Sequence, residues 1–529
     1  MSLLLHNLIE QSADINPDKK ALIFKNLKMS YDELSEYIEQ VARGLIFHGL
    51  SRHERVAVYL PKHFETVIAF FAISKAGGVF VPVNPILKAP QVTHILHDCN
   101  ARILITSKIR FEGLEAELTE CHDLQTVILI DIDEASTKHI STVNIVAWQN
   151  LLTATDKEIR RHTIDIDMAA ILYTSGSTGK PKGVVLSHRN MVAGAHSVAQ
   201  YLNNKAEDRL LAVLPFSFDY GFSQLSTAFS VGATTVLMDY LLPRDVIKVV
   251  AREKVTGLAA VPPLWIQLAQ LSWPKEAQDS LRYITNSGGA MPITTLRKLQ
   301  TALPGTQVFL MYGLTEAFRS TYLPPEELER RPDSMGKAIP NAEIMVVRED
   351  GSPCAAGEPG ELVHRGSLVA MGYWNDPEKT SERFKSVPYI EQGLPLHEIA
   401  VWSGDTVKMD EEGYLYFISR KDEMIKTSGY RVSPTEIEEI IYQSGMVSEV
   451  IALGVPHPTL GQAIIVVVIP AADKPFDSDL LQTECVRNLP AYMVPAMIIE
   501  RRSLPRNPNG KIDRKLLATE FCDYFNEKS

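Results

Sequence analysis

Short apolar runs alternate with longer mixed segments along most of this chain of 529 residues. The runs at residues 56–60, 102–106 and 126–130 have the length and apolar character of buried strands. The segment 63–75, between the first two runs, has the length of a helix. Strands separated by helices favour largely parallel sheets with helices on their faces, so the pattern predicts an α/β fold.

The pattern changes near residue 410. The polar stretch 410–413 indicates a turn, and the apolar and aromatic stretch 414–418 after it indicates a strand, so the two predict a hairpin. The charged sequence Arg420-Lys-Asp-Glu423 follows, and the apolar runs 451–455 and 463–469 predict strands of a smaller unit. We expect a large N-terminal domain of layered α/β sheets over residues 1–421. A small α+β domain would follow over residues 422–529.

Composition and charge narrow the class of protein. Hydrophobic residues make up 45% and charged residues 22% of the chain, as in ordinary globular proteins. The net charge of −11 argues against non-specific binding of nucleic acid. The apolar run 67–73 is interrupted shortly afterwards by Lys75 and two glycines, so we expect no membrane span. Five scattered cysteines without metal-ligand spacing favour the reducing cytoplasm as the location.

Residues 173–183, with the sequence Tyr-Thr-Ser-Gly-Ser-Thr-Gly-Lys-Pro-Lys-Gly, follow the strand-like run 168–172. Glycines allow the backbone N–H groups of such a loop to turn towards an anion, and its hydroxyls and lysines add donors and positive charge. Pro181 stands where a Walker A loop would have Ser or Thr. The sequence therefore predicts a polyphosphate loop of another kind, with an ordinary surface turn as the alternative.

Together with this loop, seven further segments resemble, in order, the motifs of the adenylate-forming superfamily. That superfamily contains acyl-CoA synthetases, luciferases and the adenylation domains of peptide synthetases. The segments are Ser30-Tyr-Asp-Glu-Leu34, Lys75-Ala-Gly-Gly-Val-Phe-Val-Pro-Val-Asn84, Tyr312-Gly-Leu-Thr-Glu316, Gly360-Glu-Leu362 with Gly372-Tyr-Trp-Asn375, Ser403-Gly-Asp405, Arg420-Lys-Asp422 and Asn509-Gly-Lys511. One such motif is weak evidence, whereas eight in the right order are specific. The resemblance implies an AMP-forming ligase that uses ATP and Mg²⁺ to turn a carboxylic acid into an acyl-adenylate.

The resemblance also implies roles for single residues. Glu316 would bind Mg²⁺, a hard cation that prefers oxygen ligands, although an acid at a helix N-terminus is the alternative. Thr315 would contact the α-phosphate, and Lys511 would be the catalytic lysine, where a solvated lysine is the alternative. The full predicted ATP-binding set is Thr174, Ser175, Gly176, Ser177, Thr178, Gly179, Lys180, Lys182, Gly288, Gly289, Ala290, Met311, Tyr312, Gly313, Asp405, Arg420 and Lys511.

Within this set, Asp405 resembles the aspartate that binds the ribose hydroxyls, and Tyr312 would flank the adenine. The family usually has Thr-Gly-Asp at this motif, and Ser403 keeps the hydroxyl of that threonine. Arg420 would support the ribose or the phosphates, and its alternative is a surface ion pair with a neighbouring acid.

Two half-reactions at one site require a rearrangement. Adenylation needs Lys511 at the phosphates, whereas attack by a thiol needs that loop removed and a channel for a pantetheine arm. The family achieves this by rotating its small domain. The resemblance places the hinge at Asp422 and lines the pantetheine channel with Gly429.

The acid that the enzyme activates depends on fewer residues. Asp219, in Phe218-Asp-Tyr-Gly221, matches domains that activate amino acids and hold the substrate's ammonium group with an aspartate. A buried carboxylate needs a cationic partner, and either that ammonium or an internal partner such as Arg319 would supply it. The family's pocket positions give the predicted substrate-binding set Asp219, Tyr220, Ser223, Ala260, Ser287, Met311, Arg319 and Ser320, together with Thr285.

The run 316–325 resembles stand-alone enzymes that load L-proline onto an acyl carrier protein, as in the anatoxin and prodiginine pathways, and also the acyl-CoA ligases associated with exosortases. We expect a carrier protein to act in trans, because few residues follow Lys511. Three functions stay open: an amino acid–carrier protein ligase, a CoA ligase for another small carboxylic acid, and a catalytically silent or luciferase-like protein. Intact Glu316, Asp405 and Lys511 argue against the third.

Overall fold

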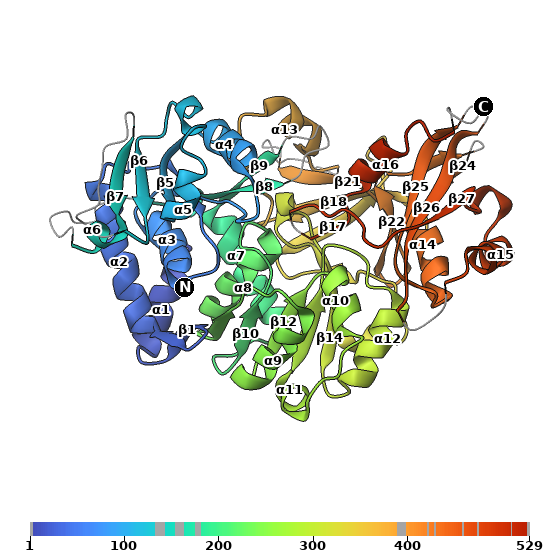
Figure 1. The fold of residues 1–529 in the computed structure, drawn as a ribbon, viewed down its shortest axis with the longest axis horizontal. Helices are drawn as coiled ribbons and strands as arrows, with labels where there is room; N and C mark the ends of the chain where they lie inside the picture. The colour runs from blue at the N-terminus through green and yellow to red at the C-terminus, as the bar shows by residue number, and fades with distance from the viewer. Residues whose placement is uncertain are drawn as a thin grey trace, which may run out of the picture.

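A computed structural model of the chain describes residues 4–132, 143–153, 163–174, 181–388, 398–420, 423–427, 430–457, 460–472, 476–508 and 510–525. Within these residues the strands form four sheets. In Figure 1 the first sheet is blue to teal and the second is mostly green. The C-terminal sheet, orange to red, lies at the opposite end of the molecule.

The first sheet has the strand order β19-β9-β8-β4-β3-β5-β6-β7. Its strands are β3 (Arg55–Tyr59), β4 (Val79–Pro82), β5 (Ala101–Thr106), β6 (Thr126–Leu129), β7 (Asn144–Ala147), β8 (Met168–Thr174), β9 (Lys182–Ser187) and β19 (Gly372–Tyr373). The strands from β8 through β4, β3, β5 and β6 to β7 are parallel, whereas β8 and β9 form an antiparallel pair. The strands expected at 56–60, 102–106, 126–130 and 168–172 are confirmed.

The second sheet has the order β16-β15-β14-β13-β12-β10-β11-β1-β2. Its strands are β1 (Lys20–Phe24), β2 (Leu27–Ser30), β10 (Arg209–Ala212), β11 (Thr234–Leu237), β12 (Gly257–Ala260), β13 (Tyr283–Asn286), β14 (Gln307–Tyr312), β15 (Thr321–Leu323) and β16 (Lys337–Ala338). The six strands from β14 to β1 are parallel, and the strands at both edges are antiparallel. Their carboxyl ends therefore meet at one edge, where open α/β sheets bind ligands.

Two helices that are buried on all sides pack between these sheets. They are α3 (Phe64–Lys75), where a helix was expected, and α8 (Asp219–Ser230). Phe70 and Phe71 of α3 contact Phe222 of α8, with ring centres 5.9 and 6.2 Å apart. A helix that is apolar around its whole circumference is normally buried in a core. The sequence of α3 is apolar in this way, so the helix has no exposed polar face.

The other α-helices of the large body pack on these two helices, on the sheets or on one another. They are α1 (Asn7–Ile15), α2 (Tyr31–Phe47), α4 (Ala89–Asp98), α5 (Lys108–Glu112), α6 (Trp148–Thr153), α7 (His188–Tyr201), α9 (Pro243–Glu253), α10 (Pro262–Leu268), α11 (Lys275–Ser280), α12 (Ile293–Ala302) and α13 (Pro377–Arg383). Helix α2 shows how the sequence sets a boundary. Ser30 accepts a hydrogen bond from the Glu33 N–H, and the Glu33 carboxylate accepts one from the Ser30 N–H.

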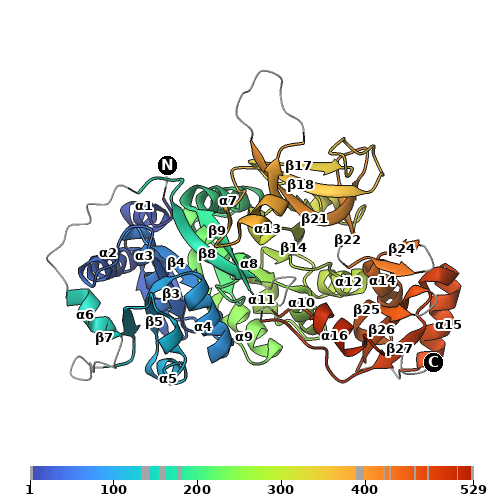
Figure 2. The same ribbon diagram turned by 90° about the horizontal axis from the view of Figure 1, so that it is seen from above.

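The third sheet contains β17 (Ala342–Val347), β18 (Gly360–Gly366), β20 (Phe384–Ser386), β21 (Ile399–Met409) and β22 (Leu415–Arg420). Figure 2 shows it above the second sheet. Strands β21 and β22 form the hairpin that the sequence predicts around residues 410–418, and their antiparallel register pairs Asp405 with Arg420.

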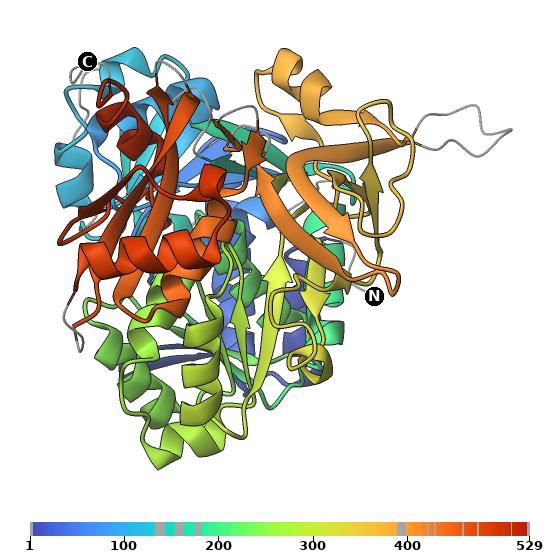
Figure 3. The same cartoon turned by 90° about the vertical axis from the view of Figure 1, so that its right-hand side faces the viewer.

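The fourth sheet contains β23 (Ile425–Thr427), β24 (Tyr430–Val432), β25 (Val447–His457), β26 (Gly461–Pro470) and β27 (Met497–Glu500). Strands β25 and β26 confirm the runs expected at 451–455 and 463–469. Together with α14 (Pro434–Gln443), α15 (Ser478–Asn488) and α16 (Arg514–Glu520), this sheet encloses two apolar clusters of its own. Figure 3 shows this part, orange to red, in front of the larger body. The α/β class is confirmed, and the exact boundary at 421/422 lies outside the described residues.

Candidate active site

The carboxyl ends of the parallel strands of the second sheet bring most of the predicted site residues together. Tyr312 ends β14, and the next turn carries Thr315 and Glu316. Asp219 opens α8 after β10, and Gly288 follows β13. The first turn of α8 packs tightly against the chain before it, because a Cβ at Gly221 would lie 2.0 Å from the carbonyl oxygen of Pro215.

The predicted nucleotide side of the site centres on Asp405. The Tyr312 hydroxyl donates to Asp405 Oδ2 at 2.5 Å, and Arg420 Nε lies 3.6 Å from Asp405 Oδ1. Ser403 positions this strand, because its hydroxyl donates to the Leu362 carbonyl and accepts from the Asp405 N–H. Burial raises the pKa of Asp405, and the Arg420 guanidinium opposes that shift.

Asp405 Oδ1 is buried and has no hydrogen-bond partner among the described residues. A buried acceptor without a donor is costly in a folded protein, so such an atom indicates a partner that comes from outside the chain. The hydroxyls of a ribose are donors of the required kind. The ribose-binding role expected for Asp405 stays a prediction.

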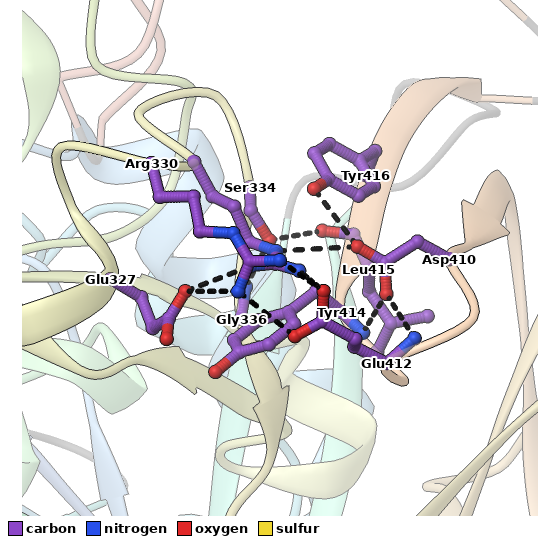
Figure 4. A network of polar contacts seen from close by, with 10 residues as sticks. Glu327, Arg330, Ser334, Gly336, Asp410, Glu412, Tyr414, Leu415 and Tyr416 are labelled. Atoms are coloured by element: carbon purple, nitrogen blue, oxygen red, sulfur yellow. Dashed lines mark hydrogen bonds and ion pairs between the residues drawn. The ribbon is translucent and has the colours of Figure 1, made fainter.

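The hairpin that carries Asp405 and Arg420 is fixed at its far end by an ion-pair network (Figure 4). The buried Arg331 donates to Glu327 at 2.8 Å and to Glu412 at 2.5 Å, and it lies 3.3 Å from Asp410. Arg330 also pairs with Glu412. Because Asp410 and Glu412 form the turn between β21 and β22, these contacts hold the hairpin against the large body.

Backbone contacts strengthen this connection. The Ser334 hydroxyl donates to the carbonyl of Leu415 at 2.9 Å and accepts from the Gly336 N–H at 3.0 Å. Gly336 has φ +85°, and a Cβ there would lie 1.8 Å from the Tyr322 carbonyl oxygen, so only glycine fits.

Glu316 lies beside Tyr373 of β19. The Tyr373 hydroxyl donates to Glu316 Oε1 at 2.5 Å, and Lys182 Nζ lies 5.5 Å from the centre of the Tyr373 ring. Burial, followed by the charge of Glu316, raises the pKa of Tyr373, so this phenol stays a donor. Sequence reasoning missed Tyr373, although the motif Gly372-Tyr-Trp-Asn375 that contains it was recognised.

A magnesium ion at Glu316 would need further ligands from a substrate or from water. Among the described residues, no group of three or more His, Cys, Asp or Glu side chains could hold a metal ion. Mg²⁺ commonly binds one or two carboxylates and completes its shell with water and phosphate oxygens. A single carboxylate beside Lys182 is consistent with that mode of binding.

Lys511 reaches into the same region from the C-terminal part of the chain. Its Nζ lies 5.3 Å from the centre of the Phe218 ring. An ideal Cβ at Gly288, where φ is +81°, would lie 3.0 Å from Lys511 Cε, so glycine leaves room for the lysine. Burial lowers the pKa of the Lys511 ammonium, and the Asp219 carboxylate opposes that shift. Lys511 thus lies within electrostatic range of Asp219 and of Asp405, which belong to the predicted acid pocket and the predicted nucleotide side.

Asp219 has an internal cationic partner. Arg319 Nη1 donates to Asp219 Oδ2 at 2.8 Å, with side chains that are 2% and 4% exposed. Thr315 Oγ1 lies 3.4 Å from Asp219 Oδ1, and Arg319 Nη2 donates to the Ser223 hydroxyl at 3.1 Å. Of the two partners that the sequence left open for Asp219, the structure contains the arginine.

A small pocket adjoins this pair. It mixes polar and apolar walls, which are Tyr220, Ser223, Gln224, Thr227, Tyr283, Thr285, Arg319, Val198, Leu202, Leu210 and Met311. The Tyr220 and Thr285 hydroxyls are 2.5 Å apart, and the Arg319 guanidinium lies 4.6 Å from the centre of the Tyr220 ring. Side chains fill most of this pocket, and the space left holds about one water molecule.

The other predicted residues have different positions. Ala260 and Ser287 are buried at the ends of β12 and β13 without lining the pocket, and Ser320 instead contacts His364, with 2.9 Å between Oγ and Nδ1. Gly289, Ala290 and Gly313 lie in the turns after β13 and β14. Thr174 and Lys182 flank the predicted phosphate loop, whereas Ser175, Gly176, Ser177, Thr178, Gly179, Lys180, Asp422 and Gly429 lie outside the described residues.

Comparison with known protein families gives two matches. The model of the family described as AMP-binding enzyme matches residues 9–374, and that of the AMP-binding enzyme C-terminal domain matches residues 436–511. The helices in the described part of the chain are each too short or too polar to cross a bilayer.

Curated relatives come from two groups of enzymes. The chain is 30% identical over 520 residues to tyrocidine synthase 3 of Brevibacillus parabrevis, with 97% of this chain but only 8% of that protein covered. It is 30% identical over 548 residues to the long-chain-fatty-acid–CoA ligase of Salmonella typhimurium, with 98% and 94% covered. The chain thus spans a small part of the first relative and nearly all of the second.

Among solved structures, ATP-bound MatB from Rhodopseudomonas palustris superposes with a TM-score of 0.87 at 25% identity, over 99% of this chain and 100% of that one. This agreement extends over the four sheets described above, including the C-terminal one. The matches to both family models and to a full-length ligase lead to one conclusion: the chain belongs to the AMP-binding enzyme family and is an AMP-forming ligase of the adenylate-forming superfamily.

Proposed function

We propose that this ligase uses ATP and Mg²⁺ to activate a small amino acid, with L-proline as the best candidate, and transfers it to the phosphopantetheine thiol of a separate acyl carrier protein. The observation that carries this proposal is the position of Lys511. It lies beside Phe218 and Gly288, within electrostatic range of both Asp219 and Asp405. The two anionic reactants, the carboxylate of the acid and the α-phosphate of ATP, must meet near the acid pocket and the ribose site. A cation in this region can neutralise their charge.

In the first half-reaction a carboxylate oxygen of the acid attacks the α-phosphorus of ATP. A new P–O bond forms, the bond to the β-phosphate oxygen breaks, and pyrophosphate leaves. Both reactants are anionic, so catalysis consists mainly of positioning and neutralisation of charge. Lys511 and Thr315 would face the α-phosphate, Lys182 would face the outer phosphates, and Glu316 would hold Mg²⁺, which neutralises phosphate charge when bound.

Asp219 supports an amino acid as the substrate. A carboxylate offers about four acceptor positions, and Asp219 accepts one hydrogen bond from Arg319 and a long one from Thr315. An ammonium group at the pocket mouth could bind the positions that remain.

A CoA ligase for a small carboxylic acid without an amine is the second candidate. The Asp219–Arg319 ion pair favours it, because Arg319 already neutralises the charge of Asp219. A substrate ammonium is then not needed to make burial of the carboxylate tolerable. Similarity to a long-chain-fatty-acid–CoA ligase supports the same candidate.

The test compares L-proline with cyclopentanecarboxylate, which has a similar ring and no ammonium group. ATP–pyrophosphate exchange is measured on the unaltered enzyme with each acid at matched concentrations. We expect exchange with proline and little with its carbocyclic analogue. Equal exchange with both acids would remove the amine-binding role of Asp219 and favour the second candidate.

The acceptor is tested separately, because either acid could be passed to either thiol. Enzyme, ATP and the better acid are incubated with a phosphopantetheinylated carrier protein or with free CoA, and thioester formation is followed by mass spectrometry. We expect the carrier to be loaded faster. Faster transfer to CoA would instead assign the enzyme to the CoA ligases.

We further propose two domains, residues 1–421 and 422–529, with the hinge at Asp422 and Gly429 beside the pantetheine channel. Rotation at the hinge would withdraw Lys511 after adenylation. Proline restricts the φ angle, so Asp422→Pro should slow one half-reaction more than the other. Small and equal effects on pyrophosphate exchange and thiol transfer would argue against a hinge at this residue.

A further inference from the structure

One hydrogen bond joins the Lys511 loop to the first sheet. The side chain of Asn84, in the turn after β4, donates from Nδ2 to the carbonyl oxygen of Pro508 at 2.8 Å. Asn84 is only 4% exposed, and 424 positions of sequence separate it from Pro508. This contact therefore connects the large body directly to the C-terminal part of the chain.

The orientation of the Asn84 amide follows from its second contact. Asn84 Oδ1 accepts a hydrogen bond from the backbone N–H of Ile86 at 3.2 Å, which closes an Asx turn. With the oxygen used inside its own turn, the amide NH₂ group must face the carbonyl of Pro508. Exchange of the two amide atoms would break both hydrogen bonds.

The loop that receives this bond is held by two hydrogen bonds of its own. The Asn507 N–H donates to the Lys511 carbonyl at 2.8 Å, and the Lys511 N–H donates to Asn507 Oδ1 at 3.0 Å. These bonds close a short turn between Asn507 and Lys511. Fixing the carbonyl of Pro508 therefore also fixes the Cα of Lys511 relative to Phe218 and Gly288.

We propose that Asn84 is a positioning residue that holds the Lys511 loop in the site during adenylation and releases it for thiol transfer. This inference rests on the proposed catalytic role of Lys511. Asn84 contacts no reacting group in the structure, and it acts through the backbone of Pro508. Because the contact is a single neutral hydrogen bond, it is weak enough to break and reform in each catalytic cycle.

The variant Asn84→Asp separates this role from a purely structural one. Aspartate keeps an oxygen for the N–H of Ile86, so the Asx turn is preserved. Its other oxygen replaces the NH₂ donor and faces the carbonyl of Pro508, acceptor against acceptor. An unsatisfied or repulsive buried contact of this kind should lower the rate of adenylation by a factor on the order of ten to one hundred.

Two measurements are made on the full-length enzyme. The first compares the half-reactions: pyrophosphate exchange, and thiol transfer from an adenylate formed beforehand. The second is hydrogen–deuterium exchange in peptides that cover residues 505–513, which needs no acid substrate. We expect Asn84→Asp to slow adenylation about ten- to hundredfold, to leave thiol transfer unchanged or faster, and to increase deuterium uptake in this segment.

The matched control is Asn150→Asp, which makes the same change of charge in another side chain whose oxygen accepts a backbone N–H, that of Ala147 at 3.2 Å. It should leave all three readouts unchanged. Asn84→Ser is a second test variant, because a hydroxyl can cap the turn but cannot reach Pro508; it should show the same split as Asn84→Asp.

Equal slowing of both half-reactions, or unchanged deuterium uptake at 505–513 in both variants, would overturn the proposal. Increased uptake without any exchange activity on the acids tested would uphold the contact and count against the proposed substrates instead. The two failures are therefore distinguishable.

Discussion

The Asp219–Arg319 ion pair gives a prediction whose size follows from the structure. Both side chains are at least 96% buried, and their charged atoms are 2.8 Å apart. At an effective dielectric constant of about 20, two unit charges about 4 Å apart attract by roughly 4 kcal/mol. Removal of one partner from a buried pair typically costs about 3–5 kcal/mol. We expect Asp219→Ala to lower the free energy of unfolding by that amount.

The remaining contacts of Arg319 explain why the free energy of unfolding lost in Asp219→Ala is not recovered. Without Asp219, the guanidinium keeps the Phe318 carbonyl at 2.8 Å and the Ser223 hydroxyl at 3.1 Å, both of which are neutral. Its Nε already lacks a hydrogen-bond partner among the described residues. The buried positive charge is then uncompensated. Arg319→Met combined with Asp219→Ala removes both charges, so the double variant should be more stable than the sum of the single losses by about 3 kcal/mol.

Urea unfolding followed by tryptophan fluorescence measures these differences. The five tryptophans all precede residue 403, so the signal reports the large body. Trp265 is fully buried, and its indole donates to the carbonyls of Ala260 and Thr285 next to the pocket. Glu343→Ala, which breaks an exposed pair with Arg365, is the control and should shift the midpoint little. Additivity of the Asp219 and Arg319 effects within about 0.5 kcal/mol would refute the reasoning.

Three further predictions concern catalysis, nucleotide binding and pH. Lys511→Ala should slow pyrophosphate exchange by about 10²–10³, because one preorganised charge donor is lost; near-normal exchange would contradict its role. Asp405→Asn should raise the KM for ATP more than it lowers kcat, since a ribose contact is uniform binding; an unchanged KM would separate Asp405 from the nucleotide. Burial lowers the pKa of His364 to about 3 from 6.5 and keeps the ring neutral, so the unfolded chain binds one more proton between these values. Stability should therefore be complete above pH 6.5 and fall on acidification by about 1.4 kcal/mol per pH unit from this residue. His364→Gln should reduce that slope in urea titrations, and an unchanged slope would place the proton elsewhere.

The sequence predicted the elements whose apolar runs are short and clearly bounded. The runs at 56–60 and 102–106 became β3 and β5, and the polar turn at 410–413 became the end of the β21–β22 hairpin. Asp405 was also predictable, because its motif fixes both the residue type and its place on a strand. Its side chain contacts Tyr312, which belongs to another of the recognised motifs.

The sequence could not choose between partners that are distant along the chain. It named Arg319 as one of two possible partners of Asp219, but the choice depends on how the turn after β14 lies against the first turn of α8, and no local pattern encodes that distance. Ser320 shows a related limit. It follows Arg319 at the entry to β15, and successive side chains of extended backbone point to opposite sides. Arg319 therefore reaches Asp219, whereas Ser320 reaches His364.

The ion-pair network at the turn of the β21–β22 hairpin has a consequence for the reaction intermediate. Through Arg331, the strand pair that holds Asp405 and Arg420 belongs mechanically to the large body. Lys511 belongs to the part that follows. If the C-terminal part rotates away after adenylation, Lys511 leaves the phosphate side. The contacts of Asp405 and Arg420 with the ribose would remain. The acyl-adenylate would therefore stay bound through its ribose while pyrophosphate leaves and the thiol enters. The activated acid would then be transferred to the thiol without first being released into water.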